Sequence, residues 1–370
     1  MKPNTHIWLA SALALALVGC GGGSGGSGAP GNGNGNGDGN GNGNGVVVEP
    51  DPTFATTAFL QEAVVGAAFG AATDLNDGSI VVGATQTSDA SPSASLRAVA
   101  WNVNSAGDST VELLPTRFDE YSRANGVNNS GMIVGEMVDD PGGGQIVAAF
   151  WADAATEAVA LQPFAASAAY GINDDGIIVG ETYANGSPAA VVWFDANALP
   201  LQLSASGAAY AISGTEAVGE MTVGTGSHAM VWRTFGGAIV DAFHLPGTAT
   251  LTGDSIALAI NDDGHISGEI VAQDGVTHAV RWIKVSDTEY EVEDLGPGSA
   301  AGINLAGRAV GHDGLGGVNP ARGASIWRAT PPLTPFPIGA AAPNDSQGLA
   351  INANGWAVGV DRNRPFVALP

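Results

Sequence analysis

Short apolar runs separated by turn residues recur along the chain from about residue 57 to its end. Seven copies of one unit carry these runs, and each copy reads as a small-residue stretch, an aliphatic residue, Asn, a turn, and an aliphatic pair ending in Gly. The copies span residues 73–83, 125–135, 170–180, 210–219, 258–268, 301–311 and 349–359. The Asn column recurs about every 46 residues as Asn76, Asn128, Asn173, Ser213, Asn261, Asn304 and Asn352. No helical periodicity is evident, so the pattern predicts an all-β chain.

Two further features recur after each unit. A Trp follows the first six units, at Trp101, Trp151, Trp193, Trp232, Trp282 and Trp327, and Ala368 stands there in the seventh. A short segment around a Leu comes next, as Leu114-Pro115, Leu161-Gln162, Leu201-Gln202, Leu245-Pro246, Leu295-Gly296 and a degenerate copy near Leu333. Each unit therefore supplies four short strand-like runs, which predicts a four-stranded propeller blade. The Trp column is expected to pack between blades, with a sugar-stacking platform as the alternative.

Residue types refine this picture. A blade is covered on both faces by its neighbours, which suits unbroken aliphatic runs such as Ile177-Ile178-Val179. The slim run from Ala168 to Gly171 suits the strand nearest a crowded axis. A Gly follows the column residue by three positions in five units, where a tight turn requires positive φ. These are Gly131, Gly176, Gly264, Gly307 and Gly355.

The two ends of the repeat region complement each other. The seventh unit stops at Pro370 after three runs, whereas Phe59-Leu60-Gln61 precedes the first unit and resembles the missing fourth run. We expect the segment from Thr57 to Val64 to add as the outer strand of the last blade, beside Phe366 to Leu369. Residues 46–370 are thus predicted to form a monomeric seven-bladed β-propeller with 3+1 closure, which leaves no open sheet edge at the join.

The first 45 residues predict export and anchoring. An apolar run from Ile7 to Val18 is too short to span a bilayer and suits a signal peptide. It ends in Leu17-Val18-Gly19-Cys20, which resembles a bacterial lipobox, so residues 1–19 would be removed and Cys20 would carry lipid. The alternative is an ordinary secretory signal with a chance cysteine. Gly21 replaces the aspartate that retains bacterial lipoproteins on the inner membrane, which favours the outer membrane. Residues 20–45 form a Gly/Asn-rich linker, which predicts a flexible tether.

The repeats also resemble the HAF family of bacterial extracellular repeats, with the pattern GIN, IVG, HAF.W and DLG. The match rests on His228-Ala229-Met230-Val231-Trp232, on Ile172-Asn173 with Val179-Gly180, and on Asp294-Leu295-Gly296. It covers residues from about 57 to 370, although the fourth unit lacks the Asn. The resemblance implies an envelope or extracellular location and no defined reaction.

Charge narrows the classes of partner. The formal net charge is −24, from 12 Lys and Arg against 36 Asp and Glu, so nucleic acid and anionic membrane surfaces would be repelled. The single cysteine excludes disulfides within the chain and cysteine-ligated clusters.

Acidic turns raise the question of calcium, because carboxylate and amide oxygens suit that ion. The candidate ligands in units one, three and five are Asp74, Asp77, Asp174, Asp175, Asp262 and Asp263. The spacing of an EF-hand loop is absent, so tight turns are the favoured interpretation, and we expect no cofactor, with calcium as the alternative.

A row of glutamates is the best candidate for chemistry. One follows the Gly of the aliphatic pair in four consecutive units, at Glu136, Glu181, Glu220 and Glu269. Carboxylates from several blades could perform acid/base work on a glycan or bind a cation. The favoured alternative is structural: Glu220 and Glu269 would pair across a hairpin with His228 and His278.

The sequence therefore supports two classes of function and leaves a third open. We favour a lipid-anchored envelope propeller that binds a carbohydrate, protein or surface ligand without catalysis. The principal alternative is a glycan hydrolase or lyase that uses the glutamate row, and the third is a structural part of an envelope complex. Loops between the second and third runs vary in length and suit ligand binding. Their carboxylates, which favour a neutral or cationic ligand, are Asp89, Asp139, Asp140, Asp274 and Asp313.

Overall fold

Short strands joined by tight turns make up the chain. A computed structural model describes residues 54–63, 69–86, 96–118, 120–140, 144–162, 166–183, 186–314, 322–331, 333–338 and 346–370. These residues form 27 strands and contain no helix, so no helix of the described part could cross a membrane. Residues 49–370 constitute one compact unit. The predicted signal peptide, Cys20 and the predicted tether lie outside the described residues.

Five sheets contain four antiparallel strands each. The first holds β2 (Gly70–Leu75), β3 (Ile80–Gln86), β4 (Leu96–Val103) and β5 (Ser109–Leu113). The second holds β6 (Ser122–Val127), β7 (Ile133–Val138), β8 (Ile146–Trp151) and β9 (Val159–Ala160). The third holds β10 (Ser167–Ile172), β11 (Ile178–Thr182), β12 (Ala189–Trp193) and β13 (Leu201–Gln202). The fourth holds β14 (Ala208–Ser213), β15 (Glu216–Val223), β16 (Gly226–Phe235) and β17 (Ala238–His244).

The fifth four-stranded sheet joins the two ends of the compact unit. It contains β25 (Ser346–Ile351), β26 (Ala357–Asp361), β27 (Arg364–Leu369) and β1 (Thr56–Phe59). β1 pairs antiparallel with β27, and Thr56 lies opposite Leu369 while Phe59 lies opposite Phe366. The first strand of the described residues is therefore the outer strand of the sheet that contains the last three.

A sixth sheet has seven strands because one long strand serves two neighbouring groups. Its members are β18 (Leu251–Ile260), β19 (Ile266–Ala272), β20 (Thr277–Lys284), β21 (Tyr290–Ile303), β22 (Ala309–Gly314), β23 (Arg322–Trp327) and β24 (Phe336–Pro337). The first part of β21 pairs with β20 as far as Pro297, and the remainder pairs with β22 from Gly298 onward.

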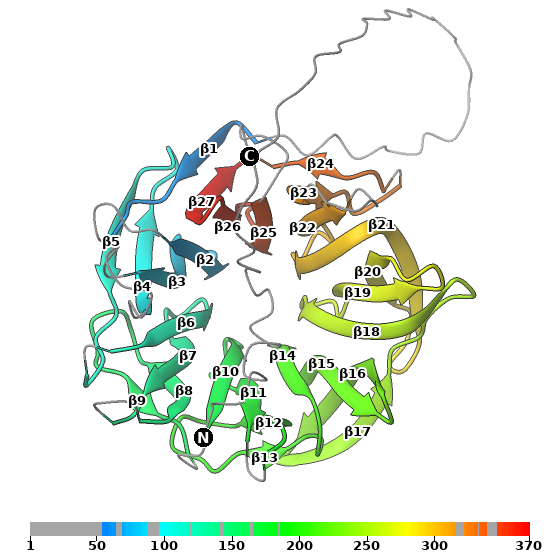
Figure 1. Cartoon of the computed structure of the whole chain (residues 1–370), viewed down its shortest axis with the longest axis horizontal. Helices are drawn as coiled ribbons and strands as arrows, with labels where there is room; N and C mark the ends of the chain where they lie inside the picture. Colours follow the sequence, from blue (N-terminus) through cyan, green and yellow to red (C-terminus); the bar gives the residue numbers. More distant parts are fainter. Residues whose placement is uncertain are drawn as a thin grey trace, which may run out of the picture. The chain divides into compact units, whose positions relative to one another are not determined.

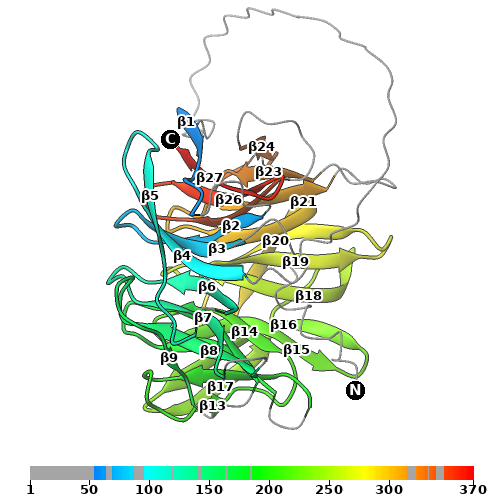
Figure 2. The same cartoon turned by 60° about the vertical axis from the view of Figure 1, so that its left-hand side comes forward.

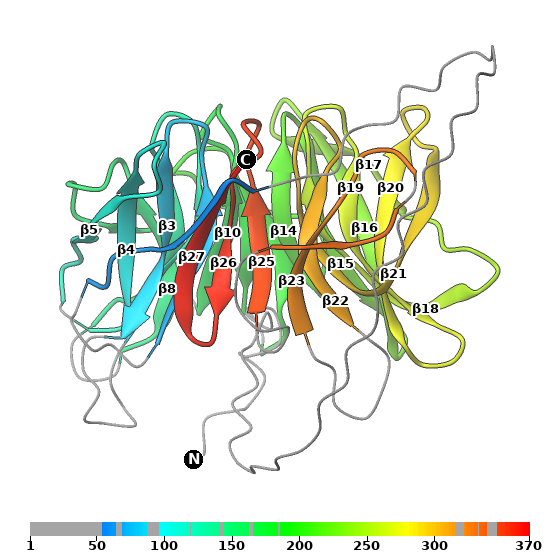
Figure 3. The ribbon, with the colours of Figure 1, turned by 90° about the horizontal axis from the view of Figure 1, so that it is seen from above.

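The sheets are arranged around a central axis as in a β-propeller (Figure 1). In each four-stranded sheet one end of the strand order lies nearest the axis, as β2, β6 and β10 do. The strand at the other end of the order, such as β5 or β9, lies at the outside. Neighbouring sheets stack face to face (Figure 2), and their strands run roughly along the axis (Figure 3). Antiparallel connectivity then puts the Asn-containing turns at one end of the axis, the turn face. The connections between second and third strands lie at the other end, the loop face.

The Gly that ends the aliphatic pair of each unit packs against a β-bulge in the innermost strand. In β10 the register shifts between Ala169 and Gly171, opposite the segment that contains Gly180. A Cβ on Gly180 would lie 2.0 Å from the backbone oxygen of Ala168, so no larger residue fits without movement of the backbone.

Indoles and aliphatic side chains fill the space between sheets. The six Trp residues of the column are at most 1% exposed, which confirms that they are buried in the core. Most indole N–H groups donate to a carbonyl at the end of the preceding sheet: Trp151 to Pro115 at 2.8 Å, Trp282 to Pro246 at 2.8 Å. Trp101 donates at 2.7 Å to Gln61, which follows β1.

The structure corrects two of the predicted Leu positions. In the first two sheets the predicted Leu donates its backbone N–H to a carbonyl of the third strand: Leu114 to Ala98 at 2.9 Å and Leu161 to Ala148 at 2.8 Å. In the third sheet Leu203, and not Leu201, donates the bond, to Ala190 at 2.7 Å. In the sixth unit Ile338, and not Leu333, occupies the position, because connections of varying length shift the register of the outer strand.

Candidate functional site

The Asn column forms a chain of hydrogen bonds from sheet to sheet around the turn face. Each side-chain amide donates to a backbone carbonyl in the turn of the next unit. The pairs are Asn76 to Asn128, Asn128 to Asn173, Asn173 to Gly214, Asn261 to Asn304, Asn304 to Asn352 and Asn352 to Asn76, at 2.8 to 3.2 Å. The amide oxygen of the same side chain accepts an N–H four residues later in its own turn, as from Ile80 to Asn76 at 2.9 Å. Each Asn thus fixes its own turn and the adjacent one.

Ser213 interrupts the Asn column, yet it still contacts the next unit. Its hydroxyl donates to Asp262 Oδ1 at 2.6 Å. Carboxylates strengthen the contacts elsewhere: both oxygens of Asp174 accept from Asn129, at 2.8 and 3.0 Å. Asp77 Oδ1 accepts from the backbone N–H of Ala353 at 2.9 Å.

A cavity of about 330 Å³ opens at the centre of the turn face. Polar side chains from units one to five and the last unit line much of it: Asn76, Asp77, Asn128, Asn129, Asn173, Asp174, Asp175, Ser213, Asp262 and Asn352. Among the described residues, its lining contains four carboxylates and no Lys, Arg or His. The cavity therefore offers hydrogen-bond acceptors to hydroxyl or cationic groups.

The aspartates that were candidate calcium ligands serve these turns. Asp77, Asp174 and Asp262 accept the inter-unit bonds given above. Asp74 accepts from Leu75 N–H at 2.8 Å and from Val127 N–H, in the next sheet, at 2.9 Å. Asp175 and Asp263 are exposed on turns. In the described part of the chain, no three His, Cys, Asp or Glu side chains lie close enough together to hold a metal ion.

The glutamate row lies towards the loop face, and three of its members are bonded to tyrosines. Glu136 and Glu181 are 4% and 3% exposed, and Glu220 is half-buried. Tyr121 donates its hydroxyl to Glu136. Glu181 accepts from Tyr170 at 2.8 Å and from Tyr183 at 3.2 Å. Glu220 accepts from Tyr210 at 2.7 Å and from Ser227.

Burial changes the pKa of Glu181. Desolvation raises its pKa from 4.5 to about 7, against the lowering effect of the Tyr170 and Tyr183 hydrogen bonds, and the charges of Glu136 and Glu220 add to the rise. Burial likewise raises the pKa of the Tyr170 and Tyr210 hydroxyls well above 10, so both remain donors. Their rings lie 5.5 Å apart between centroids.

The predicted pairing of Glu220 and Glu269 with histidines is wrong in register. His228 lies opposite Met221, while Glu220 lies opposite Ala229. His278 lies opposite Ile270, one residue beyond Glu269. A one-residue offset puts side chains on opposite faces of a sheet, and His278 instead lies 2.8 Å from Asp294.

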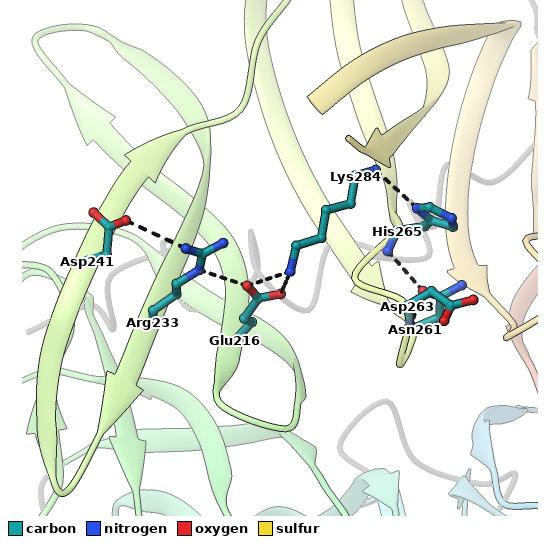
Figure 4. Close-up of polar contacts among 7 residues, drawn as sticks. All are labelled: Glu216, Arg233, Asp241, Asn261, Asp263, His265 and Lys284. Carbon is teal, nitrogen blue, oxygen red and sulfur yellow. Dashed lines mark hydrogen bonds and ion pairs between the residues drawn. The ribbon is translucent and has the colours of Figure 1, made fainter. Parts of the chain in front are cut away.

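Sequence reasoning missed the ionic contacts that join neighbouring sheets. Glu216 of β15 binds Arg233 at 2.8 Å and also Lys284 of β20 at 2.8 and 2.9 Å (Figure 4). The fully buried Arg281 of β20 donates to Glu293 at 2.8 Å and to the carbonyls of Gly307, Arg328 and Ala329. These partners lie up to 68 residues apart, and the sequence carries no local signal for them.

A serine column was also missed, although its spacing could have revealed it. A serine lies six residues before the Asn in four units and accepts a backbone N–H from the third strand of the preceding sheet. The serines are Ser122, Ser167, Ser255 and Ser346, with bond lengths of 2.9 or 3.0 Å.

The variable loops contribute only in part to the described structure. Asp139, Asp140, Asp274 and Asp313 are described, and Asp89 lies outside the described residues.

Comparison with known proteins adds distant structural likeness. No family model and no curated protein matches the chain. Among 26 matching chains of solved structures is TolB from Acinetobacter baumannii, at 10% identity and a TM-score of 0.48, over 78% of this chain and 63% of that one. Sqt1 from Chaetomium thermophilum matches at 11% identity and a TM-score of 0.33, over 81% of this chain and 84% of that one. The chain thus spans less than two thirds of the length of the TolB structure.

Proposed function

We propose that this chain is a lipid-anchored envelope protein whose β-propeller acts as a non-catalytic binding module. The propeller would have seven four-stranded blades, with β21 contributing to two of them and β1 completing the last by 3+1 closure. The chain of Asn contacts supports this count, because Asn352 of the seventh unit bonds to Asn76 of the first. Cys20 would carry the lipid, and the lipobox and HAF resemblances support an outer-membrane location.

The observation that carries the binding function is the cavity of the turn face. Its wall combines amide groups with Asp77, Asp175 and Asp262, whose oxygens suit the hydroxyl groups of a carbohydrate. Its charge disfavours anionic ligands. The Asn contacts fix the surrounding turns, so the wall is preorganised and little ordering is required when a ligand binds.

Retention on immobilised polysaccharides tests this function. The purified protein is incubated with a panel of neutral, cationic and anionic polysaccharides, and both retention and new products are scored. We expect retention on a neutral or cationic member without products, and a loss of retention in the Asp175→Asn, Asp262→Asn double variant. The Asp153→Asn variant, which changes an exposed carboxylate outside the cavity lining, serves as the matched control and should bind as the wild type does. Retention that is equal in both variants would contradict the assignment of the cavity.

Anchoring is tested by fractionation. The Cys20→Ala variant should lose incorporation of labelled fatty acid and move from the membrane to the soluble fraction. A variant that remains in the membrane fraction would contradict lipid attachment at Cys20.

A glycan hydrolase or lyase is the second candidate, and the pKa of Glu181 favours it. A carboxyl group with a pKa of about 7 is able to act as a general acid near neutral pH. Replacement of Glu136, Glu181, Glu220 and Glu269 by Gln would abolish turnover with the fold intact if this candidate is right. Products formed equally by wild type and variant would exclude the glutamate row as the catalytic group.

A further inference from the structure

Three carboxylates of the glutamate row accept hydrogen bonds from tyrosines in three consecutive sheets. We define the Glu–Tyr array as Glu136, Glu181 and Glu220 with the hydroxyl donors Tyr121, Tyr170, Tyr183, Tyr210 and Ser227. The members Tyr170 and Tyr210 occupy the bulge positions of β10 and β14, where the register shifts. Their contact connects the carboxylate of one sheet to that of the next.

The array concentrates negative charge with little compensation. In the described structure neither Glu136 nor Glu181 nor Glu220 has an ion pair with Lys, Arg or His. Among the described residues, Arg123 lies opposite Glu136 in the β6–β7 register, and its charge opposes the rise in the pKa of Tyr121 that burial and Glu136 cause. Like charges in a desolvated site repel strongly, and after burial the charges of Glu136 and Glu220 add to the rise in the pKa of Glu181.

Glu181 lies in the middle sheet of the three, and burial raises its pKa to about 7. Its carboxylate accepts from the hydroxyls of Tyr170 and Tyr183. The charges of Glu136 in β7 and Glu220 in β15, which belong to the preceding and the following sheet, also act on it. Proton uptake at Glu181 removes its repulsion with both neighbouring glutamates. Deprotonation restores that repulsion in a site that is only 3% exposed.

Several hydroxyl donors of the array lie where the chain enters or leaves the connections of the loop face. Tyr121 immediately precedes β6, Tyr183 immediately follows β11, and Ser227 is the second residue of β16. A change in the charge of the array therefore acts directly on the ends of three loop-face connections: the one that leads into β6, the one from β11 to β12, and the one from β15 to β16.

We propose that the Glu–Tyr array is a pH-sensitive switch: one proton, held at Glu181, fastens the adjoining loop-face connections to the sheets, and its release loosens them. The switch is independent of the proposed ligand cavity, which lies at the turn face. Its test requires no ligand, so its failure and that of the proposed binding function are distinguishable.

Amide hydrogen exchange of the full-length protein at pH 5.5 and pH 8, corrected for intrinsic rates, tests the switch. We expect the opening constant at Tyr183 and Ser227 to rise roughly tenfold at pH 8 in the wild type, since one pKa unit corresponds to a tenfold change. In Glu181→Gln the opening constant should be the same at both pH values. In Glu157→Gln, which removes an exposed carboxylate, the wild-type response should persist. Amides of the β19–β20 hairpin, such as Val276, provide an internal reference.

Equal exchange at both pH values in the wild type, or an undiminished response in Glu181→Gln, would overturn the proposal. If Glu181→Gln fails to fold, Tyr183→Phe provides a second test. Loss of this donor removes a bond that favours the ionised carboxylate, so the midpoint of the exchange transition should move to higher pH. A midpoint that is unchanged in Tyr183→Phe would also overturn it.

Discussion

The side-chain amide of Asn352 donates a 3.0 Å hydrogen bond to the backbone carbonyl of Asn76, 276 residues earlier in the chain. Asn352 is 6% exposed, and its amide oxygen accepts the N–H of Trp356 at 2.9 Å. One side chain thus holds its own turn and joins the last repeat to the first.

Removal of this side chain should destabilise the protein. In Asn352→Ala the carbonyl of the buried Asn76 and the N–H of the half-buried Trp356 both lose a partner. We expect the free energy of unfolding in urea to fall by about 1 to 3 kcal/mol. The control is Asn354→Ala, which removes an exposed 3.3 Å contact to Asp77 and should change stability by less than about 0.5 kcal/mol. Equal effects of the two substitutions would contradict a closing role for Asn352.

Deletion of residues 46–65 should cause aggregation or a large loss of thermal stability. The deletion removes β1, exposes the edge of β27, and takes away the carbonyl of Gln61 that accepts the Trp101 indole N–H. An open edge is a template for pairing with another chain. Melting and light scattering of the deletion variant measure the effect, and a variant lacking residues 21–45 is the control. An unchanged melting curve after deletion of residues 46–65 would rule out closure by β1.

Arg281→Met should be among the most destabilising single substitutions. All five N–H groups of the buried guanidinium are bonded, to Glu293 and to three carbonyls between Gly307 and Ala329. Loss of the cation leaves the carboxylate and the carbonyls without this donor, and we expect a cost of about 3 kcal/mol in chemical unfolding. The matched control is Arg362→Met, whose side chain is 59% exposed and which should cost less than about 0.5 kcal/mol. A loss of unfolding free energy close to that of the control would disprove the stabilising role of the Arg281 hydrogen bonds.

Ser79→Gly should stabilise the first turn. Ser79 has a φ of 77° at the position where Gly131 of the second unit has 83°. A left-handed conformation costs a residue with a side chain about 1 to 2 kcal/mol, and the greater freedom of Gly in the unfolded chain offsets part of the gain. We therefore expect the free energy of unfolding, calculated from the midpoint of the urea transition, to rise by about 0.5 kcal/mol in Ser79→Gly. The opposite exchange at the equivalent position of the second unit, Gly131→Ser, should lower the free energy of unfolding. A rise in both variants would contradict a cost of positive φ at these positions.

Stability should fall as the pH rises from about 4 to 7. Burial raises the pKa of Asp74 from 3.8 to about 7, against the opposing effect of its bonds from Val127 and Leu75. The native state therefore holds a proton that the unfolded chain releases between about pH 4 and 7, so the free energy of unfolding decreases with pH across this window. Melting temperatures should decrease from about pH 4 to 7 and then level off, and the decrease should be smaller in Asp74→Asn. A slope that is unchanged in the variant would assign the pH dependence to other carboxylates.

The strand pattern and the turn chemistry could be predicted from the sequence. Gly131, Gly176, Gly264, Gly307 and Gly355 all have positive φ, between 77° and 83°. A tight turn restricts the backbone locally, so the residue type alone reveals it.

The partners of the polar side chains could not be predicted in the same way. The bond from Asn76 to Asn128 depends on how one sheet is rotated against the next, which no local spacing records. The same holds for Glu181. Tyr170 donates to it because Tyr170 occupies a bulge, which changes the direction of the tyrosine side chain. Leu203, and not Leu201, occupies the position equivalent to Leu114 and Leu161, just after the outer strand β13, because a connection of variable length fixed the register there.

The continuous strand β21 has a consequence for cooperativity. It passes from the outside of one group of strands to the innermost position of the next at Pro297 and Gly298, where a Cβ on Gly298 would lie 2.2 Å from the His312 carbonyl oxygen. The strands β18–β20 and β22–β24 therefore share one covalent and hydrogen-bonded element. Neither group can detach from the axis without breaking the ladder of the other, so this arc of the molecule should melt as a single foldon.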